Sequence, residues 1–469
     1  MADESGLNPF IFPLQGGLVL NQSTFAMNPG MALELENFEP DTKGGYRRIT
    51  GYQKWNTNIV PHTSASTEPV LMTAFYDNQV IAARGEKIFK ATGATNALNG
   101  ALNNSATTIT VDSTTGFSTV GTILIGSEQV TYTGVSSTTF TGCTRGANST
   151  SAAAHLDNAV VQQYWTQIDT GRTGAGKYTF NRFNIGGINY IAWADGANNA
   201  SYYNGTTVTD ISATGAPADP KIIAGFKNHA FFAGMSSNRQ ELVFTAPYSI
   251  NSFSSADGAG SISIDSPITA LTVFREELFI FAEERIYKLA GNTVADFVLQ
   301  PVTREIGCKN GFTVQEFAGD IVFLGPDGLR SVAATERIGD VELGTISLPV
   351  QERFEGIINP EEFDSLVIPD KTQYRIFFNN RSERTQAQTK GIICVRKGDS
   401  YEFSETKGIQ PSCTDYLISS GVTYVLHGGY DGYVYRQEQG NDFDGTTIIG
   451  RYRSPDIVAG DAGIRKNFQ

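Results

Sequence analysis

Residues 274–291 read FREELFIFAEERIYKLAG, in which an aromatic residue precedes two turn-prone or polar residues, an apolar strand, a polar turn and a second strand. Short runs of β-branched and aromatic residues bounded by turn residues are typical of β-strands. The same order begins again at Tyr76, Phe183, Phe226 and Phe317. Subtracting the residue numbers places the copies from Phe183 onward 43, 48 and 43 residues apart. The repeat therefore predicts a chain built from similar units of several strands each.

A period of about 40–50 residues with several strands per unit is typical of a β-propeller. One small sheet cannot bury both of its faces, whereas radial stacking buries the apolar faces between neighbouring sheets. Two looser units follow, at residues 367–403 and 416–437. We predict an all-β fold: a β-propeller of about six to seven blades with an inserted small β-domain and an extended N-terminal arm. A series of β-sandwiches with coincidental spacing is the alternative.

The inserted segment, residues 94–164, is crowded with Thr, Ser, Gly and Ala. Its only Asp, Glu, Lys or Arg residues are Asp112, Glu128, Arg145 and Asp157. Exposed loops accept such insertions because closure entropy grows slowly with loop length. We therefore expect four regions: residues 1–60 form the N-terminal arm and the start of the propeller, 61–93 and 165–440 the propeller platform, 94–164 the inserted module, and 441–469 a C-terminal segment. A short helix is expected within 348–364.

The formal net charge of −13 argues against tight binding of nucleic acid, which needs clustered Lys and Arg. It suits a surface that lets DNA pass, or it serves solubility alone. The four cysteines, Cys143, Cys308, Cys394 and Cys413, are too sparse for a disulfide scaffold, so we expect buried thiols and a reducing cytoplasm. The sequence MADESGLNPF has no basic start of a secretory signal, and no apolar run is long enough to span a membrane.

Residues that carry chemistry do not gather into a recognisable motif. The four histidines, His62, His155, His229 and His427, show no metal-ligand spacing, and no hydrolase, P-loop or dinucleotide motif occurs. Adjacent glutamates on a strand point to opposite faces, so the pairs Glu276-Glu277, Glu283-Glu284 and Glu361-Glu362 are interpreted as solvated turn residues rather than glycosidase carboxylates. We predict no enzyme activity, no catalytic, cofactor-binding or metal residues, and no cofactor; residues that bind partners are not identified.

Two further sets of residues have more than one interpretation. Within the repeat units Asp-Gly occurs at Asp195, Asp257, Asp327 and Asp431. These dipeptides could be calcium loops or sialidase Asp boxes, but the Ser before and the Thr-Trp after Asp-Gly of an Asp box are missing at all four, and we interpret them as type I′ hairpin turns. Trp165, Trp193, Tyr202 and Tyr203 could stack on sugar rings, although aromatic residues of a propeller more often lie between blades. Arg47-Arg48 could contact a partner carboxylate or form ion pairs within the fold.

The N-terminal residues 12–55, FPLQGGLVLNQSTFAMNPGMALELENFEPDTKGGYRRITGYQKW, resemble the opening of tail hub or nozzle proteins of short-tailed bacteriophages. There an arm is followed by an ENF…GGYRRI.GY segment that leads into a propeller. The inserted stretches TTITVDSTTGF, GTILIGSEQVTYTG and TFTGCTRG resemble a small β-domain found widely in phage virion proteins. The resemblance covers the first 60 residues and the insertion; for the rest it concerns architecture only.

The resemblance implies a structural virion protein of the phage tail, assembled in the host cytoplasm. Its expected form is a homohexameric ring at the distal end of a short tail, a channel for DNA ejection without specific DNA binding. Expected partners are the adaptor (head-to-tail connector) ring, tail spikes or fibres, and a needle or plug. The arm is expected to lace onto neighbouring subunits. The alternative function is a phage adhesin module that binds host glycans.

Overall fold

The computed structural model describes residues 13–62, 68–173, 176–332, 345–355, 357, 360–378 and 390–456. Nearly all of the regular structure in this part of the chain is β-strand. The named helical segments are short 3-10 turns: η1 (Ser255–Asp257), η2 (Gly311–Thr313), η3 (Leu348–Arg353), η4 (Pro360–Glu362) and η5 (Pro369–Lys371). The expectation of a short helix within 348–364 is met only by the 3-10 turns η3 and η4.

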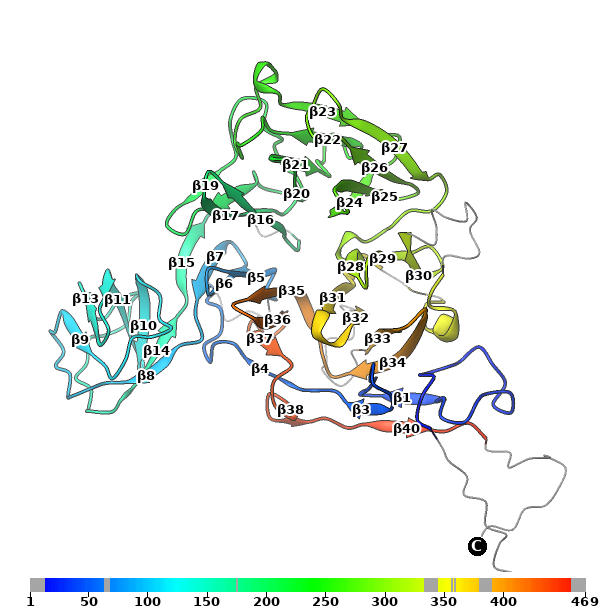
Figure 1. Cartoon of the computed structure of the whole chain (residues 1–469). Helices are drawn as coiled ribbons and strands as arrows, with labels where there is room; N and C mark the ends of the chain where they lie inside the picture. The colour runs from blue at the N-terminus through cyan, green and yellow to red at the C-terminus, as the bar shows by residue number, and fades with distance from the viewer. Residues whose placement is uncertain are drawn as a thin grey trace, which may run out of the picture.

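Seven sheets surround a central axis, and blades 1 to 4 are four-stranded and antiparallel (Figure 1). From the axis outward, blade 1 contains β5 (Met72–Tyr76), β6 (Gln79–Arg84), β7 (Lys87–Ala91) and β15 (Thr166–Thr170). Blade 2 contains β16 (Thr179–Ile185), β17 (Ile188–Ala194), β18 (Ser201–Tyr203) and β19 (Val208–Asp210). Blade 3 contains β20 (Ile222–Phe226), β21 (His229–Ala233), β22 (Glu241–Phe244) and β23 (Gly260–Ser263). Blade 4 contains β24 (Ile268–Phe274), β25 (Glu277–Ala282), β26 (Ile286–Ala290) and β27 (Val298–Thr303).

Blades 5 to 7 are less regular. Blade 5 contains β28 (Gln315–Phe317), β29 (Asp320–Gly325) and β30 (Gly328–Ser331). Blade 6 contains β31 (Asp364–Ile368), β32 (Gln373–Phe378), β33 (Lys390–Lys397) and β34 (Ser400–Lys407), followed on the outside by β1 (Glu34–Glu36) and β40 (Arg451–Arg453). Blade 7 contains β35 (Pro411–Ser419), β36 (Val422–Gly429) and β37 (Val434–Gln437), followed by β4 (Tyr52–Lys54), β38 (Asp442–Phe443) and β39 (Thr446–Thr447).

The ring is closed by a strand from the start of the chain. Strand β4 pairs antiparallel with β37, and the Trp55 amide donates to the Val434 carbonyl at 2.8 Å. On the axial side, the carboxylate of Asp415 in β35 accepts a hydrogen bond from the amide of Phe75 in β5 at 2.7 Å. Blade 7 therefore takes its fourth strand from the N-terminal region and packs directly against blade 1.

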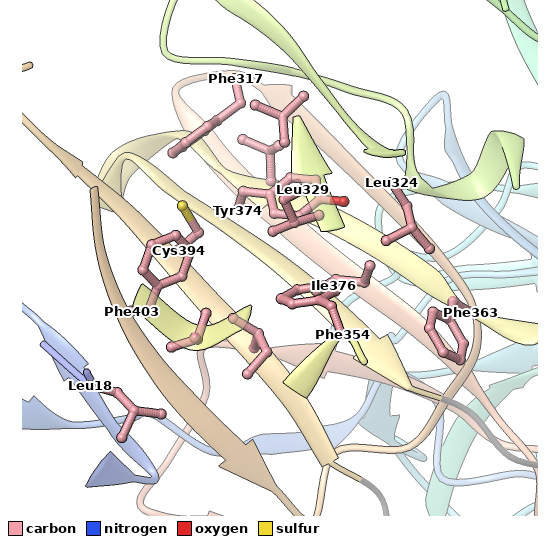
Figure 2. Packing of buried hydrophobic residues seen from close by; sticks show 14 of the residues in the cluster. Leu18, Phe317, Leu324, Leu329, Phe354, Phe363, Tyr374, Ile376, Cys394 and Phe403 are labelled. Atoms are coloured by element: carbon pink, nitrogen blue, oxygen red, sulfur yellow. The ribbon is translucent and has the colours of Figure 1, made fainter. Parts of the chain in front are cut away.

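Seven separate clusters of buried apolar side chains fill the seven interfaces between neighbouring blades, and an eighth lies within the inserted module. Figure 2 shows the cluster between blades 5 and 6, where Phe317 and Leu329 face Tyr374 and Phe403, and Leu18 of the N-terminal arm joins them. Each large apolar side chain buried in this way contributes about 1.5–3 kcal/mol. The fold prediction of a β-propeller is confirmed, and the blade number is seven.

The sequence repeat corresponds to the hairpin between the first and second strands of each blade. In blades 1, 3, 4 and 5 the aromatic residue is the last residue of the inner strand, and a two-residue loop follows it. Both loop residues have positive φ, as at Lys227 (45°) and Asn228 (67°) of blade 3. Two-residue loops with positive φ at both positions are type I′ turns, whose twist matches that of the flanking strands.

Two details of the turn predictions are wrong. In blade 2 the inner strand continues past Phe183 to Ile185, and the type I′ loop is Gly186-Gly187. At these four Asp-Gly dipeptides only the glycine has positive φ, so none of them is a type I′ turn. Asp431, for example, instead accepts a hydrogen bond from the Tyr433 amide at 3.2 Å, which forms an Asx turn. A fifth dipeptide, Asp444-Gly445, has φ values of 48° and 91° and forms the type I′ loop between β38 and β39.

The inserted module lies between β7 and β15 and projects from the side of the ring (Figure 1). One of its sheets contains β11 (Glu128–Tyr132), β10 (Gly121–Ile125), β14 (Val160–Tyr164) and β8 (Thr95–Ala97). The other contains β12 (Gly134–Val135), β13 (Thr139–Thr141) and β9 (Thr108–Thr110). The two sheets enclose their own apolar cluster, which includes Ile123, Val130 and Phe140.

A buried carboxylate organises the loops of this module. Glu128 binds the Arg145 guanidinium through both carboxylate oxygens, at 2.7 and 2.8 Å, and His155 Nε2 at 2.7 Å. The amides of Gly146 and Ala153 donate to it at 3.0 and 3.1 Å. Burial raises the pKa of Glu128, but these hydrogen bonds outweigh burial and lower its pKa to about 2. Arg145 and Gly146 of the TRG segment therefore bind Glu128.

We expect Ala318→Asn to stabilise the protein by about 0.5–1 kcal/mol. Ala318 has a φ of 53° and precedes Gly319, which has a φ of 79°. Asparagine adopts positive φ at lower cost than alanine, and Asn-Gly is the preferred type I′ pair. Urea unfolding measures the change, and Ala318→Val, which is β-branched, should destabilise instead. Equal stability of the two variants would contradict the role of this turn.

We expect Glu128→Gln to lower the stability of the inserted module by about 3 kcal/mol, because it leaves the buried Arg145 without its counter-charge. Amide hydrogen exchange of peptides covering 121–135 measures the loss, and Asp157→Asn serves as the control. Because the pKa of Glu128 falls from 4.5 to about 2 on folding, its stabilisation is complete above pH 4.5 and is lost progressively toward pH 2. Unchanged protection factors of these amides in the wild type between pH 5 and 3, that is, exchange rates divided into the intrinsic rates at each pH, would argue against it.

Candidate assembly surface

Both ends of the described chain lie together on the outer side of blades 6 and 7 (Figure 1). Strand β1 pairs in parallel with β34 and antiparallel with β40, so blade 6 gains one strand from each end of the chain. The hairpin of β2 (Phe38–Pro40) and β3 (Tyr46–Arg48) lies between β1 and β4 in the sequence. We call the surface formed by residues 13–54 and 438–456 the terminal surface.

Asn37, within the ENF segment, joins three parts of this surface. Its side-chain amide donates to the Ile449 carbonyl at 2.9 Å, which ties down the C-terminal segment. Its side-chain oxygen accepts from the Lys407 amide at 2.8 Å and from the Thr406 hydroxyl at 3.3 Å, which ties it to blade 6. Asn37 is buried and has a φ of 56°, a conformation that asparagine tolerates better than most residues.

Tyr46, within the GGYRRI segment, fastens the beginning of the arm. Its hydroxyl donates to the Gly30 carbonyl at 2.7 Å and accepts from the Gly17 amide at 2.9 Å, and burial raises its pKa well above the usual value. Gly30 has a φ of 98°, and a Cβ atom there would lie 1.6 Å from the Pro13 carbonyl oxygen, so only glycine fits. The Leu18 amide donates to Phe403 of blade 6 at 2.7 Å.

Glu39 is the centre of a buried charge network that joins the arm to blades 6 and 7. Its carboxylate lies 2.6 Å from Arg47, 2.8 Å from Lys371 and 3.2 Å from Arg375, and both Glu39 and Arg375 are fully buried. Glu438, which follows β37, binds the same Arg375 at 2.8 Å. Burial raises the pKa of Glu39, but attraction to Arg375 and Lys371 outweighs it and holds the pKa below 4.5.

These contacts show how the arm lies on its own chain. Residues 13–56 are bound to the propeller of their own chain through Asn37, Glu39 and Tyr46, and lacing of the arm onto neighbouring subunits stays a prediction. Residues 1–12 lie outside the described residues. Arg47 forms an ion pair with Glu39 within the fold, and its contact with a partner carboxylate stays a hypothesis.

The terminal surface also has features that suit a protein partner. Strand β40 pairs with β1 on one side and, within the described part of the chain, with no strand on the other. A mainly apolar groove of about 240 Å³ lies beside it, with Asn37, Phe443 and Ile449 in its lining. The Ile449 side chain is 61 % exposed, and Phe25 of the arm is 70 % exposed. An open strand edge beside exposed apolar side chains is the arrangement used in strand addition between chains.

The inserted module is held firmly at its root. Asn56, directly after the closing strand β4, donates to the carbonyls of Thr92 and Gln163 at 3.0 and 2.7 Å, one on each chain connection. The buried side chain of Gln163 donates to the Thr122 carbonyl at 2.8 Å and accepts from the Ser118 amide at 3.0 Å. The module therefore has a fixed attachment to the ring.

The aromatic residues considered for sugar stacking do not form a surface. Trp165 and Trp193 lie in the clusters between blades 7 and 1 and between blades 1 and 2, and Tyr203 is buried beside Trp193. Tyr202 is half-buried between blades 2 and 3. These side chains belong to the core.

The other candidate residues are dispersed. The four cysteines are buried free thiols, and burial raises the pKa of each, to about 11 for Cys143 and Cys308 and to about 12 for Cys413. Among the described residues no group of three His, Cys, Asp or Glu side chains is placed to hold a metal ion. Likewise, no helix in the described part of the chain has the length and apolar character needed to cross a membrane. Glu276 pairs with Lys227 of blade 3, and Glu283 with Arg239.

No family model and no curated protein matches the chain. Solved structures with a similar fold include Sqt1 of Saccharomyces cerevisiae, 8 % identical, with 84 % of this chain and 100 % of that chain covered and a TM-score of 0.42. The Pan2 WD40 domain of Neurospora crassa is 10 % identical, with 84 % and 97 % covered and a TM-score of 0.37. An ancestral GH74 enzyme is 9 % identical, with 85 % and 53 % covered and a TM-score of 0.32. At these values the matches carry no argument about function.

We expect Glu39→Gln to lower the free energy of unfolding by about 3 kcal/mol, because it removes the fully buried one of the two carboxylates that balance Arg375 and Lys371 and leaves only Glu438. Asp41→Asn is the matched control: Asp41 lies 3.3 Å from the half-exposed Arg47, and its loss should cost under about 1 kcal/mol. Urea unfolding measures both. Equal effects would show that the Glu39 network does not hold the termini.

Proposed function

We propose that the chain is a structural virion protein that forms the distal ring, the nozzle or hub, of a short phage tail. In this role six copies assemble around a channel for DNA ejection, below the adaptor ring. The ring also provides a platform for spikes, fibres and a plug. The resemblance of residues 12–55 to such proteins motivates the proposal, and the terminal surface supports it.

The observation that carries the proposal is the construction of the terminal surface. The residues of the ENF…GGYRRI.GY segment fix both chain ends against blades 6 and 7, and leave β40 and Ile449 beside an apolar groove. A ring-forming protein needs a rigid surface that pairs with a different surface of its neighbour, since such contacts close into rings.

The charge and the inserted module fit the same role. A net charge of −13 in each copy disfavours adhesion of DNA to a ring of several copies. The inserted module, held by Asn56 and projecting from the ring, suits the docking of spikes or fibres (Figure 1). No side chain described above forms a catalytic cluster, and the proposal requires no enzyme activity. The adhesin alternative receives no support from Trp165 and Trp193, which are buried.

We expect the purified protein, alone or with its adaptor ring, to give sixfold rings with an open centre in negative-stain class averages. Ile449→Glu should abolish the rings and leave folded monomers, because it places a charge beside the apolar groove. Ile418→Glu is the matched control: Ile418 is 55 % exposed but lies at the β35–β36 hairpin, away from the terminal surface. Single propellers that do not change when the adaptor ring is added would overturn the proposal, as would rings that tolerate Ile449→Glu.

A further inference from the structure

The closure of the ring creates a cavity of about 470 Å³ in blade 7. Its walls come from the closing strand β4, from β36 and β37, and from the β38–β39 hairpin, so the cavity exists only when the chain ends are in place. Its size lies within the range of small-molecule sites, about 300–1,000 Å³. The lining residues are Tyr52, Gln410, His427, Gly429, Tyr430, Asp431, Tyr435, Phe443, Asp444 and Thr446.

One wall of the cavity is a cluster of four aromatic rings. Tyr52 stacks on Phe443 with ring centroids 5.1 Å apart, and His427 stacks on Tyr435 at 5.0 Å. Tyr52 also meets His427 and Tyr435 edge to face, at 4.9 Å each. All four side chains are buried, so the cluster forms a rigid apolar wall, while Tyr430 at the adjacent turn is half-exposed.

The cavity also contains polar groups with hydrogen-bonding capacity. His427 is buried, burial lowers its pKa to about 3, and its Nδ1 has no hydrogen-bond partner among the described residues. A neutral imidazole has one donor and one acceptor nitrogen. At the mouth, Asp431, Asp444 and Thr446 are exposed, and Gln410 adds an amide.

A cation lies near each of the two carboxylates. Asp444 lies 2.8 Å from Lys54. Asp431 accepts the Tyr435 hydroxyl at 2.5 Å; burial lowers the pKa of the neighbouring Arg84, and attraction to Asp431 opposes that shift. An additional cation would therefore gain little in this cavity. The carboxylate oxygens still have unused lone pairs, which can accept hydrogen bonds from a neutral ligand.

We propose that this cavity is a binding site for a saccharide residue. A sugar ring has an apolar C–H face that can pack against the half-exposed Tyr430, which the buried aromatic cluster supports from behind. Its hydroxyl groups both donate and accept, which matches a lining of acceptor carboxylates, an amide, a hydroxyl and a neutral imidazole. A neutral ligand also fits a cavity whose charges are already compensated. The inference does not depend on ring assembly, although Phe443 and Thr446 line both this cavity and the groove of the terminal surface.

Saturation-transfer NMR on the full-length protein tests the site. The probes are glucose, galactose, mannose, N-acetylglucosamine and their common disaccharides, with methylguanidinium as the cationic competitor. We expect saturation transfer to at least one sugar and none to methylguanidinium. Tyr430→Ala and Asp431→Asn should weaken sugar binding by at least about tenfold, the effect of losing a ring contact or one good hydrogen bond.

Two exposed residues outside the cavity supply matched controls. Tyr248→Ala removes a tyrosine that is 69 % exposed, and Asp257→Asn neutralises an exposed aspartate of blade 3; both should bind sugar as the wild type does. Urea unfolding checks that each variant is folded. If Tyr430→Ala does not fold, Asp431→Asn still tests the site, because the asparagine oxygen can accept the hydrogen bond from the Tyr433 amide that forms the turn. Absence of transfer to every sugar, binding of methylguanidinium instead, or wild-type affinity in the folded cavity variants would overturn the proposal.

Discussion

The pairing of β4 with β37 is the contact on which the rest of the structure depends. Each blade buries its two faces only against neighbours, so a linear chain of seven blades leaves two apolar faces uncovered until its ends meet. Tyr52–Lys54 completes blade 7, and Phe75 of β5 is joined to Asp415 of β35 across the same junction. The arm, the Glu39 network and the cavity in blade 7 are all positioned by this closure.

The sequence predicts the parts of the fold that depend on local chemistry. The aromatic residue and the two residues after it mark a hairpin because a two-residue loop imposes its conformation on the adjacent strands. The prediction misplaced the turn of blade 2, where the glycines at 186 and 187, rather than Phe183, determine the end of the strand. The Asp-Gly dipeptides within the blades misled because aspartate also forms Asx turns, as at Asp431.

The terminal surface could not be predicted in the same way, because the contacts that fasten the arm to blade 6 and to the C-terminal segment join residues more than 300 positions apart. Nothing adjacent to Glu39 in the sequence indicates that Lys371 and Arg375 complete its network, and nothing near Asn37 points to Ile449. The buried ion network joins the arm to the strands of blade 6. In the inserted module, by contrast, Glu128 and Arg145 are only 17 residues apart.

The closing strand β4 lies near the start of the chain, and its partner β37 lies near the end. The propeller is therefore unable to complete its ring on the ribosome until the last blade has been made. At synthesis rates of about 5–20 residues per second, β4 waits roughly 20 to 80 seconds for β37 to emerge. Throughout that time an unpaired strand and an uncovered blade face are available to other nascent chains or to a chaperone. The inserted module, whose contacts are local, has no such delay. Premature pairing of chains before closure is thus the main hazard of this architecture during biogenesis.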